Sequence, residues 1–174
     1  MSNHILTTKS RTEEKFLRKK TVDFNFQKHG RGEINALISK MREVMSSAKG
    51  IGLSANQIGL NFKVFVVEVP KSRGTSKFYA VFNPKIEKVS GEIATFEEGC
   101  LSVPYKYGEV ERPQKITISG FNKSGRPIKI KAWGLLARVF QHEIEHLNGQ
   151  LFTDKAKRVY EYEEVTKFSK TTPK

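Results

Sequence analysis

The sequence predicts an α+β protein in which mixed or antiparallel β-sheets surround a metal-binding helix near the C-terminus. Three observations lead to this prediction. Apolar residues between Gly32 and Lys49 recur at helical spacing, and residues 63–130 are rich in strand-forming types. The stretch Gln141–Gly149 contains the His-Glu-x-x-His pattern of metal-binding helices. Neither a repeat nor a linker divides the 174 residues, so we expect a single domain spanning 1–174.

The composition limits the classes of partner. A formal net charge of +13 attracts acidic partners, but no nucleic-acid-binding motif accompanies it. We therefore expect no sequence-specific nucleic acid binding. No apolar run approaches the ~20 residues of a membrane span, so we expect no membrane contact. The single cysteine cannot form an intrachain disulfide and fits a reducing compartment. These features predict a cytoplasmic protein, with an organelle as the alternative.

The N-terminal part contains one clear element. Residues 1–31 are polar and weakly patterned, and no element is predicted there. An amphipathic helix is predicted over Gly32–Lys49, because its apolar residues form one stripe at helical spacing. Gly50 is a plausible C-terminal stop for this helix. The stripe consists of Ile34, Leu37, Ile38, Met41, Val44 and Met45.

Strand signals fill the middle of the chain. Strands are predicted at Lys63–Val69, Phe78–Phe82 and Ile93–Phe96. Isoleucines alternate with polar residues on both sides of the turn Asn122–Gly125, which predicts a hairpin. Residues 155–174 form a charged tail whose apolar residues could belong to a short amphipathic helix. Those residues are Val159, Tyr160, Tyr162, Val165 and Phe168.

His142 and His146 are four residues apart, so a helix stacks them on one face. Two neutral imidazoles at this spacing can bind one divalent metal, and Glu143 lies beside the first of them to transfer protons. Leu135 and Val139 continue the same helical stripe. An apolar surface that runs into a metal pair is typical of a catalytic cleft with a hydrophobic specificity pocket.

The residues alone do not decide which side chain is the third metal ligand. Phe152 occupies the position of the third histidine of metzincins, which excludes that class of protease. Another zinc peptidase could use a downstream carboxylate, with Glu164 as the candidate. The upstream candidate is Cys100. A third interpretation is a basic, non-catalytic binding module stabilised by its metal, although a structural zinc site normally needs a fourth protein ligand.

Three stretches resemble, in order and spacing, the signature motifs of the peptide deformylase family. They are Gly50–Gln57, Glu98–Ser102 and Gln141–Gly149, and the resemblance covers about residues 34–154. It implies a hydrolase that removes the N-formyl group from the N-terminal formyl-methionine of nascent polypeptides and releases formate. The sequence departs from the family at Ser54, where alanine is usual, and at Glu145, where aspartate is usual.

The resemblance also implies roles for individual residues. Cys100, His142 and His146 would bind the metal, which is Fe²⁺ in the family, with Zn²⁺, Ni²⁺ or Co²⁺ able to replace it. Three protein ligands leave a position for a water that attacks the formyl carbon. Glu143 would be the general acid/base, and the oxyanion would be stabilised by Gln57 and the backbone N–H of Leu101. The methionine pocket would be lined by Ile51, Phe96, Leu135 and Val139, and Gly52 would also bind the substrate.

The partners implied are N-formylmethionyl peptides of nascent chains. A transient contact with the ribosome through the basic surface is a further expectation, and the protein is expected to be a monomer.

Overall fold

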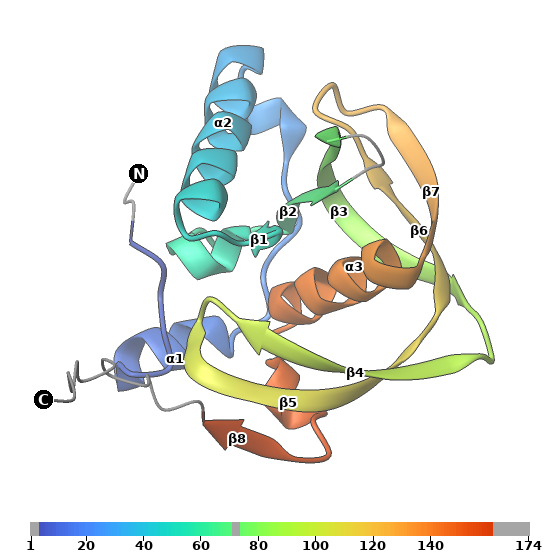
Figure 1. The fold of residues 1–174 in the computed structure, drawn as a ribbon. Coiled ribbons are helices and arrows are strands. Elements are labelled where there is room, and N and C mark those ends of the chain that lie inside the picture. The colour runs from blue at the N-terminus through green and yellow to red at the C-terminus, as the bar shows by residue number, and fades with distance from the viewer. Residues whose placement is uncertain (1–3, 71–73, 162–174) are drawn as a thin grey trace, which may run out of the picture.

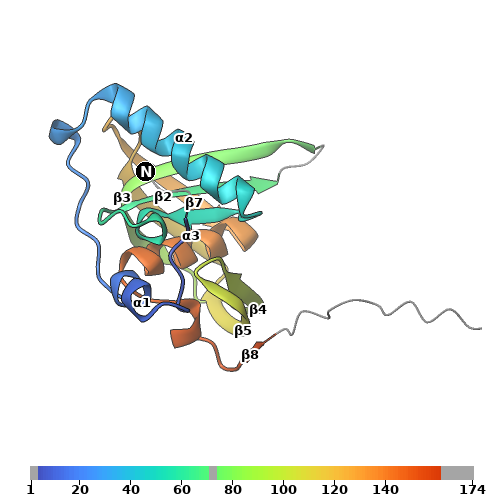
Figure 2. The ribbon, with the colours of Figure 1, turned by 90° about the vertical axis from the view of Figure 1, so that its left-hand side faces the viewer.

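The computed structural model describes residues 4–70 and 74–161, which form stacked layers of helix and sheet (Figures 1 and 2). Helix α2 (Arg31–Ser47) covers one face of the larger sheet, and helix α3 (Gly134–Leu147) packs on the opposite face. A smaller sheet lies on the other side of α3. Helix α3 is therefore enclosed between the two sheets.

The larger sheet has five strands in the order β1-β2-β3-β6-β7, and each neighbouring pair is antiparallel. Its strands are β1 (Gly52–Ser54), β2 (Val64–Pro70), β3 (Ser76–Val89), β6 (Lys115–Phe121) and β7 (Pro127–Trp133). The smaller sheet has the order β4-β5-β8, with β4 (Ile93–Cys100), β5 (Val103–Pro113) and β8 (Val159–Glu161). The long strands β3 and β5 each pair with two neighbours, one on either side.

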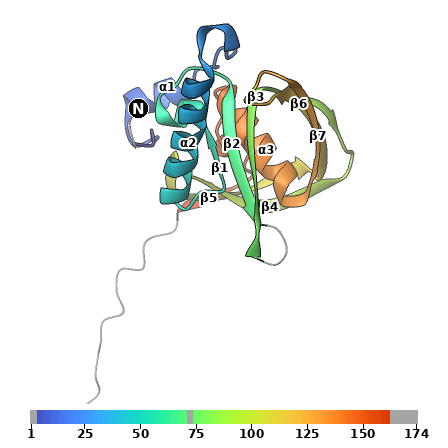
Figure 3. The same ribbon diagram turned by 90° about the horizontal axis from the view of Figure 1, so that it is seen from above.

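Strand β2 is apolar on both faces, because a helix covers each of them. Val64 and Val66 pack with α2, whereas Phe65 and Val67 pack with α3. A strand buried on both sides loses the usual alternation of apolar and polar residues. Figure 3 shows that α2 lies beside β1 and β2 and away from β6 and β7.

Helix α3 buries an apolar face against the larger sheet. Its Phe140 packs against Phe65 and Tyr79, with ring centroids 5.3 Å apart in both pairs. Ile144 and Leu147 belong to the same buried cluster. A third, smaller core lies under the second sheet, formed by Val103, Val110, Leu151 and Phe152. The last two residues belong to the turn after α3, which includes the 3₁₀ helix Phe152–Asp154.

The structure confirms the α+β class, the antiparallel sheets, the N-terminal amphipathic helix and a C-terminal helix that carries the His-Glu-x-x-His pattern. The predicted hairpin is formed by β6 and β7. Helix α1 (Arg11–Leu17) was not predicted, because it lies within the weakly patterned segment. The helix predicted in the tail is wrong for Val159–Glu161, which form β8, and the rest of that prediction lies outside the described residues. No described helix is both long and apolar enough to cross a membrane.

Candidate metal centre and active site

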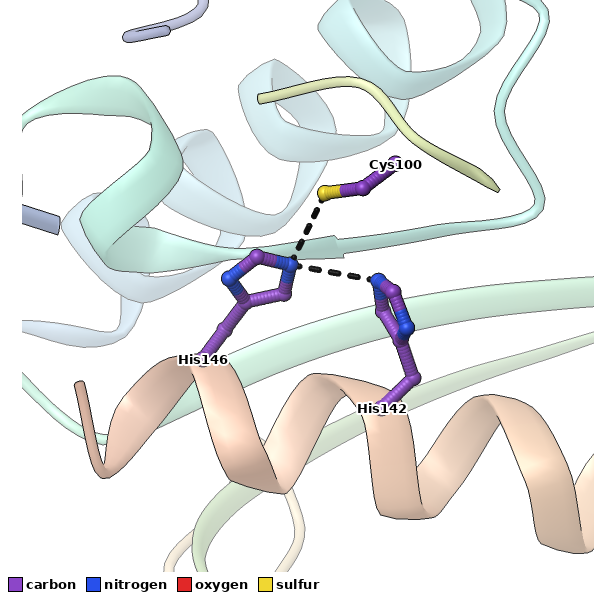
Figure 4. A group of neighbouring side chains, drawn as sticks. All are labelled: Cys100, His142 and His146. Atoms are coloured by element: carbon purple, nitrogen blue, oxygen red, sulfur yellow. Dashed lines mark hydrogen bonds between the residues drawn. The ribbon is translucent and has the colours of Figure 1, made fainter. Parts of the chain in front are cut away.

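Helix α3 and the end of β4 bring the three predicted metal ligands together (Figure 4). Sγ of Cys100 lies 3.1 Å from Nε2 of His146, and this nitrogen lies 3.2 Å from Nε2 of His142. All three donor atoms lie within 4.8 Å of one another. In a tetrahedral zinc site, N–N and S–N separations would be about 3.3 and 3.6 Å, from Zn–N and Zn–S bonds of about 2.05 and 2.3 Å. The donor set therefore fits a divalent metal in both chemistry and spacing.

The cysteine is prepared for metal binding by its neighbours. Burial alone would raise the pKa of Cys100, yet the nearby His146 and His142 hold it well below the usual value. A lowered pKa favours the thiolate, which is the form that binds metals. A thiolate beside two imidazoles accepts iron as well as zinc, because the ligand is soft.

A buried network of charges orients His142. Its Nδ1 lies 3.0 Å from Oε2 of Glu98, so Nδ1 donates and Nε2 is left free for the metal. Burial disfavours the charged form of Glu98, but hydrogen bonds from Arg112 and His142 hold its pKa well below the ordinary range. Arg112 joins Glu98 to Glu145 with bonds of 2.5 to 2.9 Å to the two carboxylates. The network fixes His142, whereas Nδ1 of His146 is buried without a hydrogen-bond partner among the described residues.

Glu143 lies on α3 next to His142 but is not among the three clustered ligands. Burial raises the pKa of Glu143 above that of an ordinary glutamate, against the opposing effect of the two histidines. Its Oε2 accepts a hydrogen bond of 2.7 Å from the hydroxyl of Ser54. Its Oε1 lies against Gly52, where a Cβ atom would be only 2.3 Å away. Glycine at this position therefore makes room for the carboxylate.

Gln57 belongs to the 3₁₀ helix Ala55–Ile58, directly after β1. Its Oε1 accepts a bond of 2.8 Å from the backbone N–H of Ser54, which directs Nε2 toward the cluster. Nε2 lies 3.0 Å from Oγ of Ser102 and 3.8 Å from Sγ of Cys100. An uncharged amide donor is thereby held beside the ligands, and Leu101 lines the adjoining cavity.

A cavity of about 680 Å³ opens onto this group of residues. Three of the four residues predicted for the methionine pocket line it, namely Ile51, Leu135 and Val139. Gly52, the other predicted substrate-binding residue, lines it too. Phe96 is not among the lining residues: it is 61% exposed, and the guanidinium of Arg138 lies 5.0 Å from its ring centroid. No role was predicted for Arg112 or Tyr105. Tyr105 lines the cavity and has a φ of 65°. Neither residue belongs to a motif, so nothing local distinguishes it.

Comparisons with known proteins agree with this geometry. The family model described as polypeptide deformylase matches residues 6–161. A peptide deformylase of Agrobacterium fabrum is 45% identical over 139 residues, which cover 79% of this chain and 81% of the relative. One from Halothermothrix orenii is 44% identical over 126 residues, covering 72% and 79%.

Solved structures show the same similarity. A probable peptide deformylase from Synechococcus phage S-SSM7 superposes with a TM-score of 0.79 at 42% identity, covering 88% of this chain and 99% of the other. Arabidopsis thaliana peptide deformylase 1B in complex with an inhibitor has a TM-score of 0.79 at 36% identity, covering 88% and 81%.

Proposed function

The chain belongs to the peptide deformylase family and is an enzyme, and we propose that its cysteine–histidine cluster holds the divalent metal of formyl-methionine hydrolysis. The reaction removes the formyl group from the N-terminus of a nascent polypeptide and releases formate. The observation that carries this proposal is the convergence of Cys100, His142 and His146 beside a cavity that Cys100 and His142 line. Three protein ligands are the number found in catalytic rather than structural zinc sites.

Proton transfer falls to Glu143. When bound, a divalent metal in this site supplies Lewis acidity, which lowers the pKa of a water so that hydroxide is available near neutral pH to attack the formyl carbon. Glu143 accepts a proton from the attacking water and returns it to the leaving amine, which frees the new N-terminus. Its raised pKa suits both steps, because a general acid/base works best when its pKa lies nearer the operating pH.

The oxyanion that develops on the formyl oxygen needs hydrogen-bond donors. We assign this role to Nε2 of Gln57 and the backbone N–H of Leu101, which flank Cys100 in the cavity wall. Loss of one such donor typically lowers the rate by ~10²–10³.

The methionine side chain would occupy the apolar part of the cavity. Ile51, Leu135 and Val139 supply aliphatic surface there, and Gly52 permits close approach of the peptide backbone. Phe96, which lies outside the lining residues, is proposed only as a contact at the outer edge of this site.

Several finer points belong to the same proposal. The metal is Fe²⁺, with Zn²⁺, Ni²⁺ or Co²⁺ as substitutes, and the chain acts as a single-domain monomer in the cytoplasm. Its positive charge supports transient contact with the ribosome. The alternative third ligand, Glu164, lies outside the described residues. The alternative of a binding module without catalysis predicts that the metal-loaded protein releases no formate.

The decisive experiment compares the wild-type protein with Glu143→Ala on formyl-Met-Ala-Ser. Formate release and metal per chain are measured on the same samples. We expect the variant to keep its metal and to lose ~10²–10⁴ in kcat, the usual contribution of a positioned general acid/base. A wild-type protein that holds its metal and releases no formate would overturn the proposal. Full activity of Glu143→Ala would overturn the assignment of Glu143 alone.

A further inference from the structure

Ser54 contacts two of the groups to which the reaction is assigned. It is the last residue of β1, is fully buried, and lies between Glu143 on α3 and Gln57 on the following turn. Building on the proposed function, we infer that Ser54 is a positioning residue. Its hydroxyl holds one oxygen of the Glu143 carboxylate and leaves the other oxygen to carry the proton.

The held oxygen is Oε2. The Ser54 hydroxyl lies 2.7 Å from this atom and 2.9 Å from the backbone oxygen of Glu143. Both acceptors belong to one residue, so the hydroxyl fixes the carboxylate relative to the helix that carries it. No other group in the described part of the chain donates a hydrogen bond to this carboxylate. Without Ser54, the carboxylate would therefore have no protein donor to hold its rotamer.

The other oxygen, Oε1, is the one available for chemistry. It lies against Gly52, and both Gly52 and Glu143 line the cavity. The missing Cβ of Gly52 leaves the space that Oε1 occupies, in a residue that is buried but lines the cavity. The two ends of β1 thus contact different oxygens of the carboxylate: Ser54 binds Oε2, and Gly52 leaves space for Oε1.

Two properties of the site make the hydroxyl testable by itself. The bond from Ser54 to Gln57 uses the backbone N–H, so replacing the side chain leaves the Gln57 amide in place. Thr21 provides a matched control, because its buried hydroxyl donates a bond of 2.8 Å to the backbone oxygen of Leu147 on the same helix. Thr21 contacts no group assigned to the reaction. Removal of the Thr21 hydroxyl therefore measures the structural effect of losing one buried hydrogen bond to α3.

The experiment compares Ser54→Ala, Ser54→Cys, Ser54→Thr and Thr21→Val with the wild-type protein. Each is measured for kcat and KM on formyl-Met-Ala-Ser, for metal per chain, for affinity to the product peptide Met-Ala-Ser, and for thermal unfolding. We expect Ser54→Ala and Ser54→Cys to lose about tenfold in kcat, since a hydrogen bond to a charged group is lost. Their KM, metal content and product affinity should stay within about twofold of wild type, because neither the ligands nor the pocket change.

The remaining variants separate positioning from stability. Ser54→Thr restores the hydroxyl and should recover most of the lost kcat, whereas Thr21→Val should lower the unfolding temperature and leave kcat unchanged. If Ser54→Thr does not fold, Ser54→Cys decides, because it keeps the volume of the side chain without a strong donor. An active wild-type protein whose Ser54→Ala and Ser54→Cys variants keep full kcat would overturn this inference and leave the proposed function intact. Equal losses of kcat in Ser54→Ala and Thr21→Val would also overturn it. A wild-type protein without deformylase activity would remove the proposed function and the inference together.

Discussion

Gly52→Ala should disable the enzyme without unfolding it. Gly52 has no left-handed backbone angle, so alanine is acceptable to the main chain and the effect comes from contact alone. The added Cβ would lie 2.3 Å from Oε1 of Glu143, 2.9 Å from Cγ1 of Val139 and 3.0 Å from Cδ of Glu143. Ordinary van der Waals contact begins at 3.4 Å. The carboxylate must therefore retreat by about 1 Å, and a displacement of that size can cost ~10²-fold in rate.

The assay is formate release under saturating peptide, with metal per chain and thermal unfolding measured in parallel. We expect kcat to fall ~10²-fold while the metal content stays unchanged, because no ligand is touched. Gly32→Ala is the matched control: nothing lies within 4 Å of its added Cβ, and it lies inside α2. It should keep full kcat and gain up to about 1 kcal/mol in stability from helix propensity. A Gly52→Ala protein with more than half of the wild-type kcat would refute the steric reasoning, as would loss of its metal.

Three further predictions concern the ligands and the charges around them. Cys100→Ser should sharply reduce metal per chain, measured by elemental analysis, because a neutral hydroxyl replaces a thiolate, whereas Glu164→Gln should leave it unchanged. The reverse pattern would favour the other zinc-peptidase interpretation. Arg112→Met should lower the free energy of unfolding in urea by about 2–3 kcal/mol, because Glu98 and Glu145 lose the buried cation that they share and keep only Arg138 and Lys155; a loss below about 1 kcal/mol would contradict this. Burial raises the pKa of Asp154, but the hydrogen bond and charge of Arg18, together with the hydrogen bond from the backbone N–H of Leu151, outweigh burial and leave the pKa below its usual value. The ion pair of Asp154 with Arg18 therefore stabilises the fold fully above the pKa of Asp154 in the unfolded chain. This stabilisation is lost as the pH falls through the lower pKa of Asp154 in the folded protein. Unfolding temperatures of wild type and Asp154→Asn should differ by a constant amount near neutral pH and converge in acid, and a gap that persists in acid would contradict the assignment.

The parts of the structure that the sequence predicts are those with a long and regular local signal. Helix α2 carries six apolar residues at helical spacing, and α3 combines such a stripe with the metal motif. Helix α2 appears within two residues of its expected bounds, and α3 contains the predicted stripe and both histidines of the motif. Helix α1 has seven residues and buries only Leu17, which is too little to produce a period. Strand β8 exists because three residues pair with β5, and no local pattern marks such an edge strand.

The residues of the candidate site also fall into two groups, those that a local motif predicts and those that it does not. Its metal-binding residues lie in motifs and could be named in advance, whereas the support around His142 depends on contacts between distant segments. Arg112 is only 2% exposed, although arginine is usually a surface residue. Its burial is possible because β4 and α3 each supply a carboxylate, which no single stretch of sequence reveals. Phe96 was expected in the pocket from its position in the family motif, but its side chain is exposed and lies against the guanidinium of Arg138.

Helix α3 is both the carrier of the ligands and the element enclosed between the two sheets. His142, Glu143 and His146 alternate along it with Phe140 and Ile144, whose side chains fill the core. Random substitution along this helix therefore alters either the chemistry or the packing, and often both. Few substitutions along α3 are therefore expected to be neutral, and the helix offers few positions at which to engineer greater heat resistance. The outward positions of β6 and β7, which α2 does not cover, are where the sequence can drift without cost to the reaction.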